Sequence, residues 1–302
     1  MDINRSNMDA LFQGFQTKFQ GALAAVPRTY AEYTTAIPST TASEIYPYLG
    51  AIGGMKEWKG DRVIRNLDSQ KLTIVNRKFE TTISVNRDDI EDDKYGVYSP
   101  MFADLGDAAG RIWLELAEAQ LRGAATAKWG DGAAFFGTTR KYGKGKDAAV
   151  ISNKTTNALS ADAYKAARQA MFEYQNGAGD YIGVQPTLLI IGSANEQLAF
   201  EILKAELTLK SDSNGAAAVQ NAWAGSSQYL VVPGLGNNWF LLDTRRPLKP
   251  IGIQQRRMPT LTRSDRDADP NVFMRDEFLY GSSARGESFW TMPHLAYAGI
   301  VG

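Results

Sequence analysis

The chain contains no cysteine and only one histidine, His294, among its 302 residues. The lack of cysteine excludes disulfides, thiolate metal sites and cysteine nucleophiles. Zinc sites without cysteine usually need several histidines, and the common catalytic triads need a histidine base close to a nucleophile. His294 follows a proline near the end of the chain, so we expect it to have a structural role.

An excess of charge of either sign is also lacking, because Lys and Arg total 33 and Asp and Glu total 33. No overall field would therefore draw the chain to nucleic acid or to an anionic membrane. No apolar run approaches the roughly 18 residues that span a bilayer, and the first residues, "MDINRSNMDALFQGFQ", show no secretory pattern. We expect a protein that is soluble and cytosolic when it is synthesised, with no membrane partner.

The sequence motifs of common enzymes are incomplete. "GTTRKYGKGK" lacks the ending of a phosphate-binding loop, "GLGNNW" lacks the third glycine of the dinucleotide fingerprint, and no nucleophile elbow occurs. Residues 264–276 resemble a calcium loop but have Pro270 where a glycine-like turn is needed, so we interpret them as a solvated acidic turn. We predict no catalytic, cofactor-binding or metal-binding residues and no enzyme. The alternative from a different class is an α/β enzyme whose active site lies in residues 186–258 and uses only carboxylate side chains.

Apolar periodicity predicts two long helices in the first half of the chain. Residues 8–26 place apolar side chains three and four positions apart and end at Pro27, while residues 99–122 repeat the pattern. Ser99 would be the N-cap of the second helix, with Pro100 in its first turn. At 1.5 Å per residue this helix would be about 36 Å long, a length typical of the backbone of a domain.

Residues from 155 onward alternate between helical and strand patterns, which indicates an α/β region. We expect one helix from a Ser160 cap to Gln175, and another from the S-x-x-E capping box at 193–196 to about Leu209. The expected strands are 186–192, 228–235, 238–244 and several within 271–300. We expect the strands within 271–300 to return to the first domain.

Two strand-like runs, 61–67 and 71–85, flank a short "DSQ" turn. Their basic side chains are Arg62, Arg65, Lys71, Arg77 and Lys78. Because these runs have too little apolar surface to be buried on both sides, we expect a long β-ribbon that projects from the body.

The most concentrated charge in the chain is the acidic segment, residues 88–93, which has five carboxylates in six positions. These are Asp88, Asp89, Glu91, Asp92 and Asp93. A helix start favours one or two such acids through the helix dipole, and a divalent cation could hold a few more. A third interpretation pairs the segment with the basic ribbon, in the same chain or in a neighbouring copy. The balance of total charge, with the two signs segregated locally, favours the third interpretation.

Several long motifs resemble those of the Mu-like phage major head subunit (gpT-like major capsid protein) family. The first is a G-x-x-x-x-x-x-E-W-x-G-x-R pattern that contains Trp58, followed by "NRKFE" at 76–80 and "RDDIEDDKYGVY" at 87–98. Residues 239–257 and 272–290 also agree, so the resemblance covers most of the chain.

The resemblance implies an α+β chain with the Hong Kong 97-type phage capsid fold. In that fold residues 1–49 would be an N-terminal arm, and residues 50–86 an extended β-hairpin loop. Residues 87–154 and 259–302 would form a peripheral domain with a spine helix at about 99–122. Residues 155–258 would form an axial domain.

The function implied is that of a major capsid protein that assembles with itself, as pentamers and hexamers, into an icosahedral head around double-stranded DNA. A separate scaffold, a maturation protease, a portal and a decoration protein are the implied partners, with assembly in the host bacterial cytoplasm and a final place in the virion. No charged helical segment precedes the arm, so we expect no fused scaffolding domain. The candidate inter-subunit contacts are Trp58, the ribbon's Arg62, Arg65, Arg77 and Lys78, and the acidic segment. The rival of the same fold is a cellular nanocompartment shell.

Overall fold

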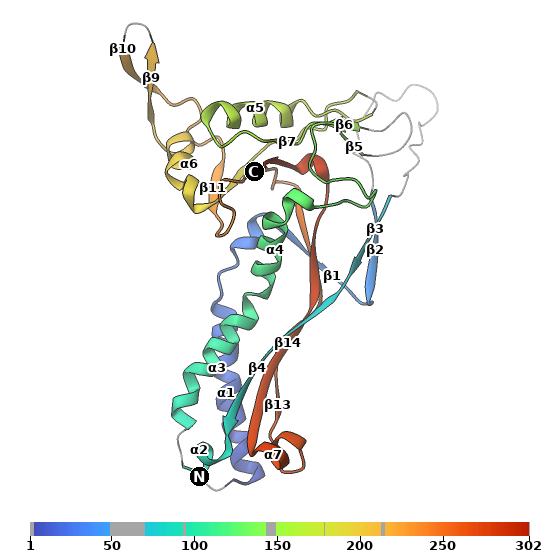
Figure 1. Ribbon diagram of the computed structural model, residues 1–302, viewed down its shortest axis with the longest axis vertical. Helices are drawn as coiled ribbons and strands as arrows, with labels where there is room; N and C mark the ends of the chain where they lie inside the picture. The colour runs from blue at the N-terminus through green and yellow to red at the C-terminus, as the bar shows by residue number, and fades with distance from the viewer. Residues whose placement is uncertain are drawn as a thin grey trace.

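A computed structural model describes residues 3–48, 70–92, 95–142, 149–177, 179–212 and 215–301. The chain forms a long lower body of helices and extended strands, on which a broader upper body sits (Figure 1). The first residues lie at the foot of the lower body, whereas the last strand ends inside the upper body. The chain therefore passes between the two bodies several times.

The lower body is built on a four-stranded sheet of order β1-β13-β14-β4. Its two central strands, β13 (Ile251–Ser264) and β14 (Glu277–Trp290), have 14 residues each and pair antiparallel. At about 3.3 Å per residue, each strand extends roughly 45 Å. The edge strands are β1 (Thr34–Pro38), parallel to β13, and β4 (Arg77–Asn86), antiparallel to β14.

β14 alternates strictly between partly exposed and buried residues as far as Ser288. Its buried side faces the helices, where Ser288 Oγ donates to the carbonyl oxygen of Leu116 at 2.7 Å. Gly286 lies under the Trp113 ring, which would be 2.6 Å from a Cβ at that position. Small residues on this strand thus make room for aromatic side chains from the helices.

Three helices cover that side: α1 (Arg5–Ala25), α3 (Tyr95–Gly110) and α4 (Ile112–Arg122). Asn4 caps α1, which confirms the predicted first helix within a few residues. Phe15 of α1 stacks on Phe102 of α3 with ring centroids 3.8 Å apart, and both rings meet the edge of Tyr280 from β14.

The predicted helix at 99–122 is present, but its boundaries differ. Helix α3 begins at Tyr95, so Ser99 is not its N-cap and Pro100 lies inside it. The helix is also interrupted at Arg111, after which α4 continues to Arg122 and ends at Gly123. Proline removes one helical hydrogen bond donor, and here the loss is tolerated in the second turn rather than the first.

The upper body contains a five-stranded mixed sheet of order β11-β8-β12-β15-β7. Its strands are β7 (Lys154–Thr155), β8 (Leu188–Ile191), β11 (Gln228–Val231), β12 (Trp239–Leu242) and β15 (Ala296–Gly299). Every residue of β8, β12 and β15 is buried, so these expected strands are confirmed as core. β15 lies between β12 and β7, although we expected the end of the chain to return to the first domain.

Two helices accompany this sheet. Ser160 caps α5 (Ala161–Phe172) by accepting from the backbone of Ala163 at 3.0 Å, as predicted, but the helix ends before Gln175. The predicted capping box at Ser193 is wrong. A 3₁₀ turn comes first, α6 (Glu196–Leu203) follows without a side-chain cap, and the chain then turns into a hairpin of β9 (Leu207–Asp212) and β10 (Gly215–Gln220).

Two further expectations differ from the structure. Residues 271–275, which begin the stretch where strands were expected, belong to the short helix α7 (Pro270–Arg275), because Pro270 fits the first helical turn and Asp276 ends it in the left-handed conformation. β3 (Gln70–Val75) pairs antiparallel with β2 (Ser43–Tyr48). β4 belongs to the main sheet and does not project, because β14 pairs with it along its whole length. Residues 61–67 lie outside the described residues.

The remaining elements are short connections. They are α2 (Arg87–Glu91), β5 (Arg140–Tyr142), β6 (Ala149–Ile151), and the 3₁₀ turns Thr29–Glu32, Ala124–Thr126, Ser193–Asn195 and Pro293–Leu295. β5 and β6 pair antiparallel.

The buried apolar residues form two clusters. One lies at the foot of the lower body, between α1, α3 and the sheet, and includes Phe19, Phe102 and Phe278. The other runs from the aromatic residues above it, such as Trp113, through the whole upper sheet. Within the described ranges, no helix is both long enough and apolar enough to cross a bilayer.

Candidate interaction surfaces

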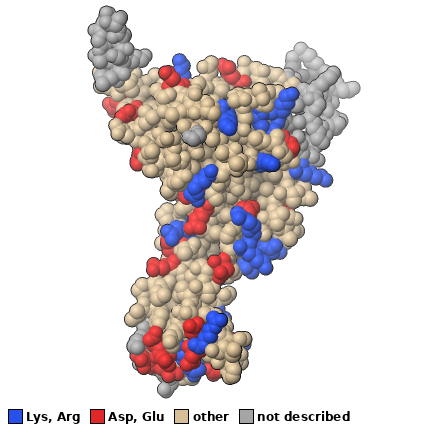
Figure 2. All heavy atoms as spheres, viewed as in Figure 1, with Lys and Arg blue, Asp and Glu red and all other residues tan. Residues whose placement is uncertain are grey.

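The acidic segment lies at the foot of the lower body, where β4 ends and α2 begins (Figure 1). Asn86 is the N-cap, and its side chain accepts from the backbone of Asp88 at 3.0 Å. Ile90 is fully buried and anchors the short helix, which leaves Asp88, Glu91 and Asp92 exposed. Acidic side chains gather at this foot around a few basic ones (Figure 2).

Several of these acids have partners in their own chain. Arg87 Nε donates to Glu91 Oε1 at 3.2 Å, and the same guanidinium lies 3.5 Å from Asp267 and 3.8 Å from Asp276. The hydroxyl of Tyr98 donates to Asp89. Arg87 was not among the predicted residues, although its spacing of four from Glu91 is a recognisable helical pair.

A metal site gains no support in the part of the chain that the structure describes. No three acidic or histidine side chains there lie as a metal ion would require. Asp93 lies outside the described residues. Asp88 and Asp89 lie in the first turn of α2, a separate helix of five residues, and not at the start of the long helix, which begins at Tyr95.

The basic candidates lie elsewhere. Arg77 Nη2 donates to Glu287 Oε1 of β14 at 2.9 Å, and its guanidinium covers the ring of Phe79 at 5.3 Å. Lys78 beside it is exposed. Trp58, Arg62 and Arg65 lie outside the described residues.

Arg77 and the acidic segment stand at opposite ends of β4. Ten strand residues at about 3.3 Å each separate them by roughly 30 Å, which no ion pair can bridge. The structure therefore does not bring Arg77 or Lys78 to the acidic segment within one chain. A contact between these residues requires a second copy.

A buried ionic cluster joins α1 to the end of β13, and sequence reasoning missed it. Asp265 is only 6% exposed and lies 3.4 Å from Arg5 and 3.4 Å from Arg263. Its burial raises the pKa of the carboxyl, against the opposite effect of the two arginines. The expectation of a solvated turn is thus wrong for Asp265. Its partner Arg5 is 260 residues away, so no local pattern could identify the pair.

His294 lies in the 3₁₀ turn Pro293–Leu295, which connects β14 to β15, and only 4% of its surface is exposed. Burial, helped by the charge of Arg246, lowers the pKa of the imidazole to about 3. The side chain is therefore neutral near pH 7. This environment is the one expected for a structural histidine.

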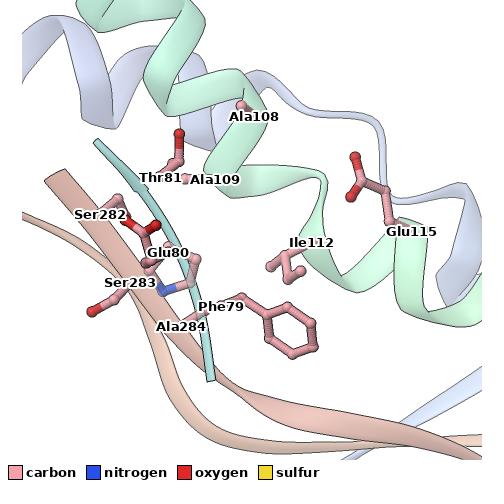
Figure 3. Close-up of a pocket in the computed structure, with 11 residues that line it drawn as sticks. Phe79, Glu80, Thr81, Ala108, Ala109, Ile112, Glu115, Ser282, Ser283 and Ala284 are labelled. Carbon is pink, nitrogen blue, oxygen red and sulfur yellow. The ribbon is translucent and has the colours of Figure 1, made fainter. Parts of the chain in front are cut away.

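A groove of about 290 Å³ lies between the helices and the β4 edge of the sheet. Phe79 from β4 and Ile112 from α4 project into it, beside the small residues Ala108 and Ala109 (Figure 3). Glu115, one turn of α4 beyond Ile112, also lines the groove, whereas the side chain of Glu80 lies on the opposite face of β4 with Thr82. The groove therefore combines an apolar interior with one carboxylate.

Comparison with known proteins places the whole chain in one family. The model of the family described as "Mu-like prophage major head subunit gpT" matches residues 8–158, 151–235 and 220–299. The chain belongs to this family of Mu-like prophage major head subunits. The match covers both bodies of the fold, and so does not depend on one motif.

Individual relatives agree with this assignment. The Mu-like prophage FluMu major head subunit of Haemophilus influenzae is 32% identical over 94% of this chain and 71% of its own length. The major capsid protein of Escherichia phage Mu is 26% identical over 97% and 74%. A solved procapsid of bacteriophage JBD30 aligns with a TM-score of 0.60 at 31% identity, covering 98% of this chain and 75% of that chain.

These findings confirm the predicted α+β, Hong Kong 97-type capsid fold. The protein is a major capsid protein of the Mu-like phage head, a structural subunit of the capsid shell in the virion.

Proposed function

We propose that copies of this chain assemble, as pentamers and hexamers, into the icosahedral head of a tailed Mu-like phage, and that this shell encloses packaged double-stranded DNA. The observation that carries the proposal is the family match from residue 8 to residue 299. A shell subunit needs surfaces that complement one another under closed symmetry, and no acid–base chemistry. Apolar burial of about 25 cal/mol per Å² then accumulates over several neighbours of each subunit.

The two bodies support the expected division of the chain. The lower body, with the spine of α3 and α4, corresponds to the peripheral domain of 87–154 and 259–302, and the upper body to the axial domain of 155–258. In the expected division residues 1–49 are the arm and 50–86 the extended loop. Three boundaries need adjustment: β4 lies in the lower sheet from Arg77 onward, β13 enters that sheet at Ile251, and β15 belongs to the upper sheet.

The acidic segment contacts the extended loop of a neighbouring copy in this proposal. The roughly 30 Å between Arg77 and α2 supports a contact between copies over one within a chain. Trp58, Arg62, Arg65 and Lys78 of the loop are the other candidate residues, and Asp93 completes the acidic side. Charge pairs of this kind fix the register of neighbours more than they supply affinity.

The protein has no catalytic role in this proposal, and its one histidine supports that view because it is buried and neutral. Its partners are a separate scaffold, a maturation protease and a portal, with a decoration protein on the outer surface. Assembly takes place in the host bacterial cytoplasm. DNA is held by enclosure, which suits a chain of zero net charge.

Nuclease protection tests the enclosed genome. Particles that contain this chain are purified from cells that carry the full set of head genes, treated with nuclease, and extracted. We expect DNA of uniform length that survives digestion only while the particles are intact. Particles that hold a cargo enzyme and no protected DNA would contradict the proposal and identify a nanocompartment shell.

A further inference from the structure

The short helix α7 exposes two large apolar side chains. Phe273 is 83% exposed and Met274 is 76% exposed, and no other large hydrophobic side chain in the described ranges is as exposed as these two. Neighbouring Arg275 is exposed as well. We call Phe273, Met274 and Arg275 the α7 knob. Adjacent exposed apolar side chains of this size are typical of contact sites.

The α7 knob is held rigidly on the end of the β13–β14 hairpin. Val272 is buried beneath it. The amide of Asn271 donates to the carbonyl oxygen of Ser264 at 3.0 Å and to that of Glu277 at 2.7 Å, so it ties the last residue of β13 to the first of β14. Asp276, at φ 55°, ends the helix in the left-handed conformation. The exposure of the knob therefore comes from a fixed conformation and not from a loose loop.

The groove between the helices and the β4 edge has the complementary properties. Phe79, Ile112 and Ala108 give it an apolar interior, and Glu115 adds negative charge (Figure 3).

We propose that the α7 knob of one copy docks into this groove on a second copy. Phe273 and Met274 occupy the apolar interior, while Arg275 lies against Glu115. The two surfaces are different patches of the same chain, so the contact is heterologous and repeats from copy to copy, as a shell requires. The inference rests on the proposed function, and it adds a contact separate from that of the acidic segment.

The absence of cysteine makes this contact directly testable. Shells of the full chain carrying both Met274→Cys and Ala108→Cys are treated with a short thiol-to-thiol crosslinker. We expect a ladder of covalent multimers on a denaturing gel, because each copy is linked to the next. Shells that carry either single substitution should give only the monomer band.

Two outcomes would overturn the docking proposal. In one, both thiols of the double variant are modified and no multimers form. In the other, Met274→Cys alone produces covalent dimers, which would place two knobs against each other. Failure of the unsubstituted chain to form any shell would instead contradict the proposed function.

A charge exchange tests the polar part of the contact. Arg275→Glu should lower the yield of shells at least fivefold, because it places a second carboxylate beside Glu115. Adding Glu115→Lys should restore most of the yield. The melting temperature of the unassembled chain serves as the folding control. An undiminished yield for Arg275→Glu, or no restoration in the double variant, would contradict this arrangement.

Discussion

The imidazole of His294 is 4% exposed, and burial lowers its pKa to about 3. In the unfolded chain the same group titrates near its ordinary value of about 6.5. Between these two values the unfolded state binds more protons than the folded state. The part of the unfolding free energy that depends on a neutral His294 is therefore fully present above about pH 6.5, and it is lost as the pH drops toward 3.

Replacing His294 removes this dependence on pH. The wild-type chain should lose about 2 kcal/mol more unfolding free energy between pH 7 and pH 5 than His294→Gln loses, because the variant has no group to protonate. Urea unfolding of the unassembled chain at both pH values gives the two losses. Equal losses in the two proteins would show that His294 does not titrate in this way.

Single residues also show what the sequence can and cannot predict. The lack of cysteine and the position of His294 indicated a protein without the usual catalytic groups. Asp265 appeared to be one of several acids in a solvated turn, but its burial depends on Arg5, which reaches it only after α1 has packed on the sheet. Burial of this kind arises from tertiary packing, so it cannot be predicted from a local sequence pattern.

Helix α1 packs on α3 so closely that a side chain is excluded at one position. A Cβ on Gly106 would lie 2.3 Å from the carbonyl oxygen of Phe19, which is backbone and cannot move aside without moving α1. Gly14, in the middle of α1, has nothing within 4 Å of the same added atom. We therefore expect replacement of each glycine by alanine to have opposite effects on stability at these two positions.

Gly106→Ala should destabilise the chain by about 1–3 kcal/mol, because it forces the two helices apart. Gly14→Ala should stabilise it by about 0.5–1 kcal/mol, through the better helix propensity of alanine. Denaturant unfolding of both variants gives the comparison. The packing account fails if Gly106→Ala is as stable as Gly14→Ala.

At the scale of elements, the sequence predicted long periodic segments better than short ones. The helices of residues 8–26 and 99–122, the cap at Ser160 and the buried strands of the upper sheet are all present. The continuation of α6 to Leu209 is wrong because pairing with β10 draws residues 207–212 into a strand. The apolar run after Pro270 favoured a strand, but it is a single helical stretch between two long strands.

At the scale of the whole molecule, charge is segregated although the total is zero. The acidic segment is at the foot, whereas Arg77 and Lys78 lie at the far end of β4. A single chain cannot bring these charges together, but neighbouring copies can. The arrangement within one chain could not be predicted from the sequence, because it depends on which strand pairs with β4.

Reversing charge at the acidic segment should prevent assembly. Asp92→Lys with Asp93→Lys is expected to reduce particle yield strongly while leaving the melting temperature of the unassembled chain nearly unchanged, because Asp92 is exposed. Glu173→Lys, an exposed acid at the end of α5, is the matched control and should assemble normally. Normal particle yield for the double variant would refute the contact between the acidic segment and the loop.

The most direct measurement of the central claim is negative-stain electron microscopy of the purified full chain, alone and with its scaffold. We predict closed shells or rings of capsomers, because the chain carries complementary surfaces that are satisfied only between copies. A protein that stays a 33.1 kDa monomer, even with the scaffold present, would contradict the account.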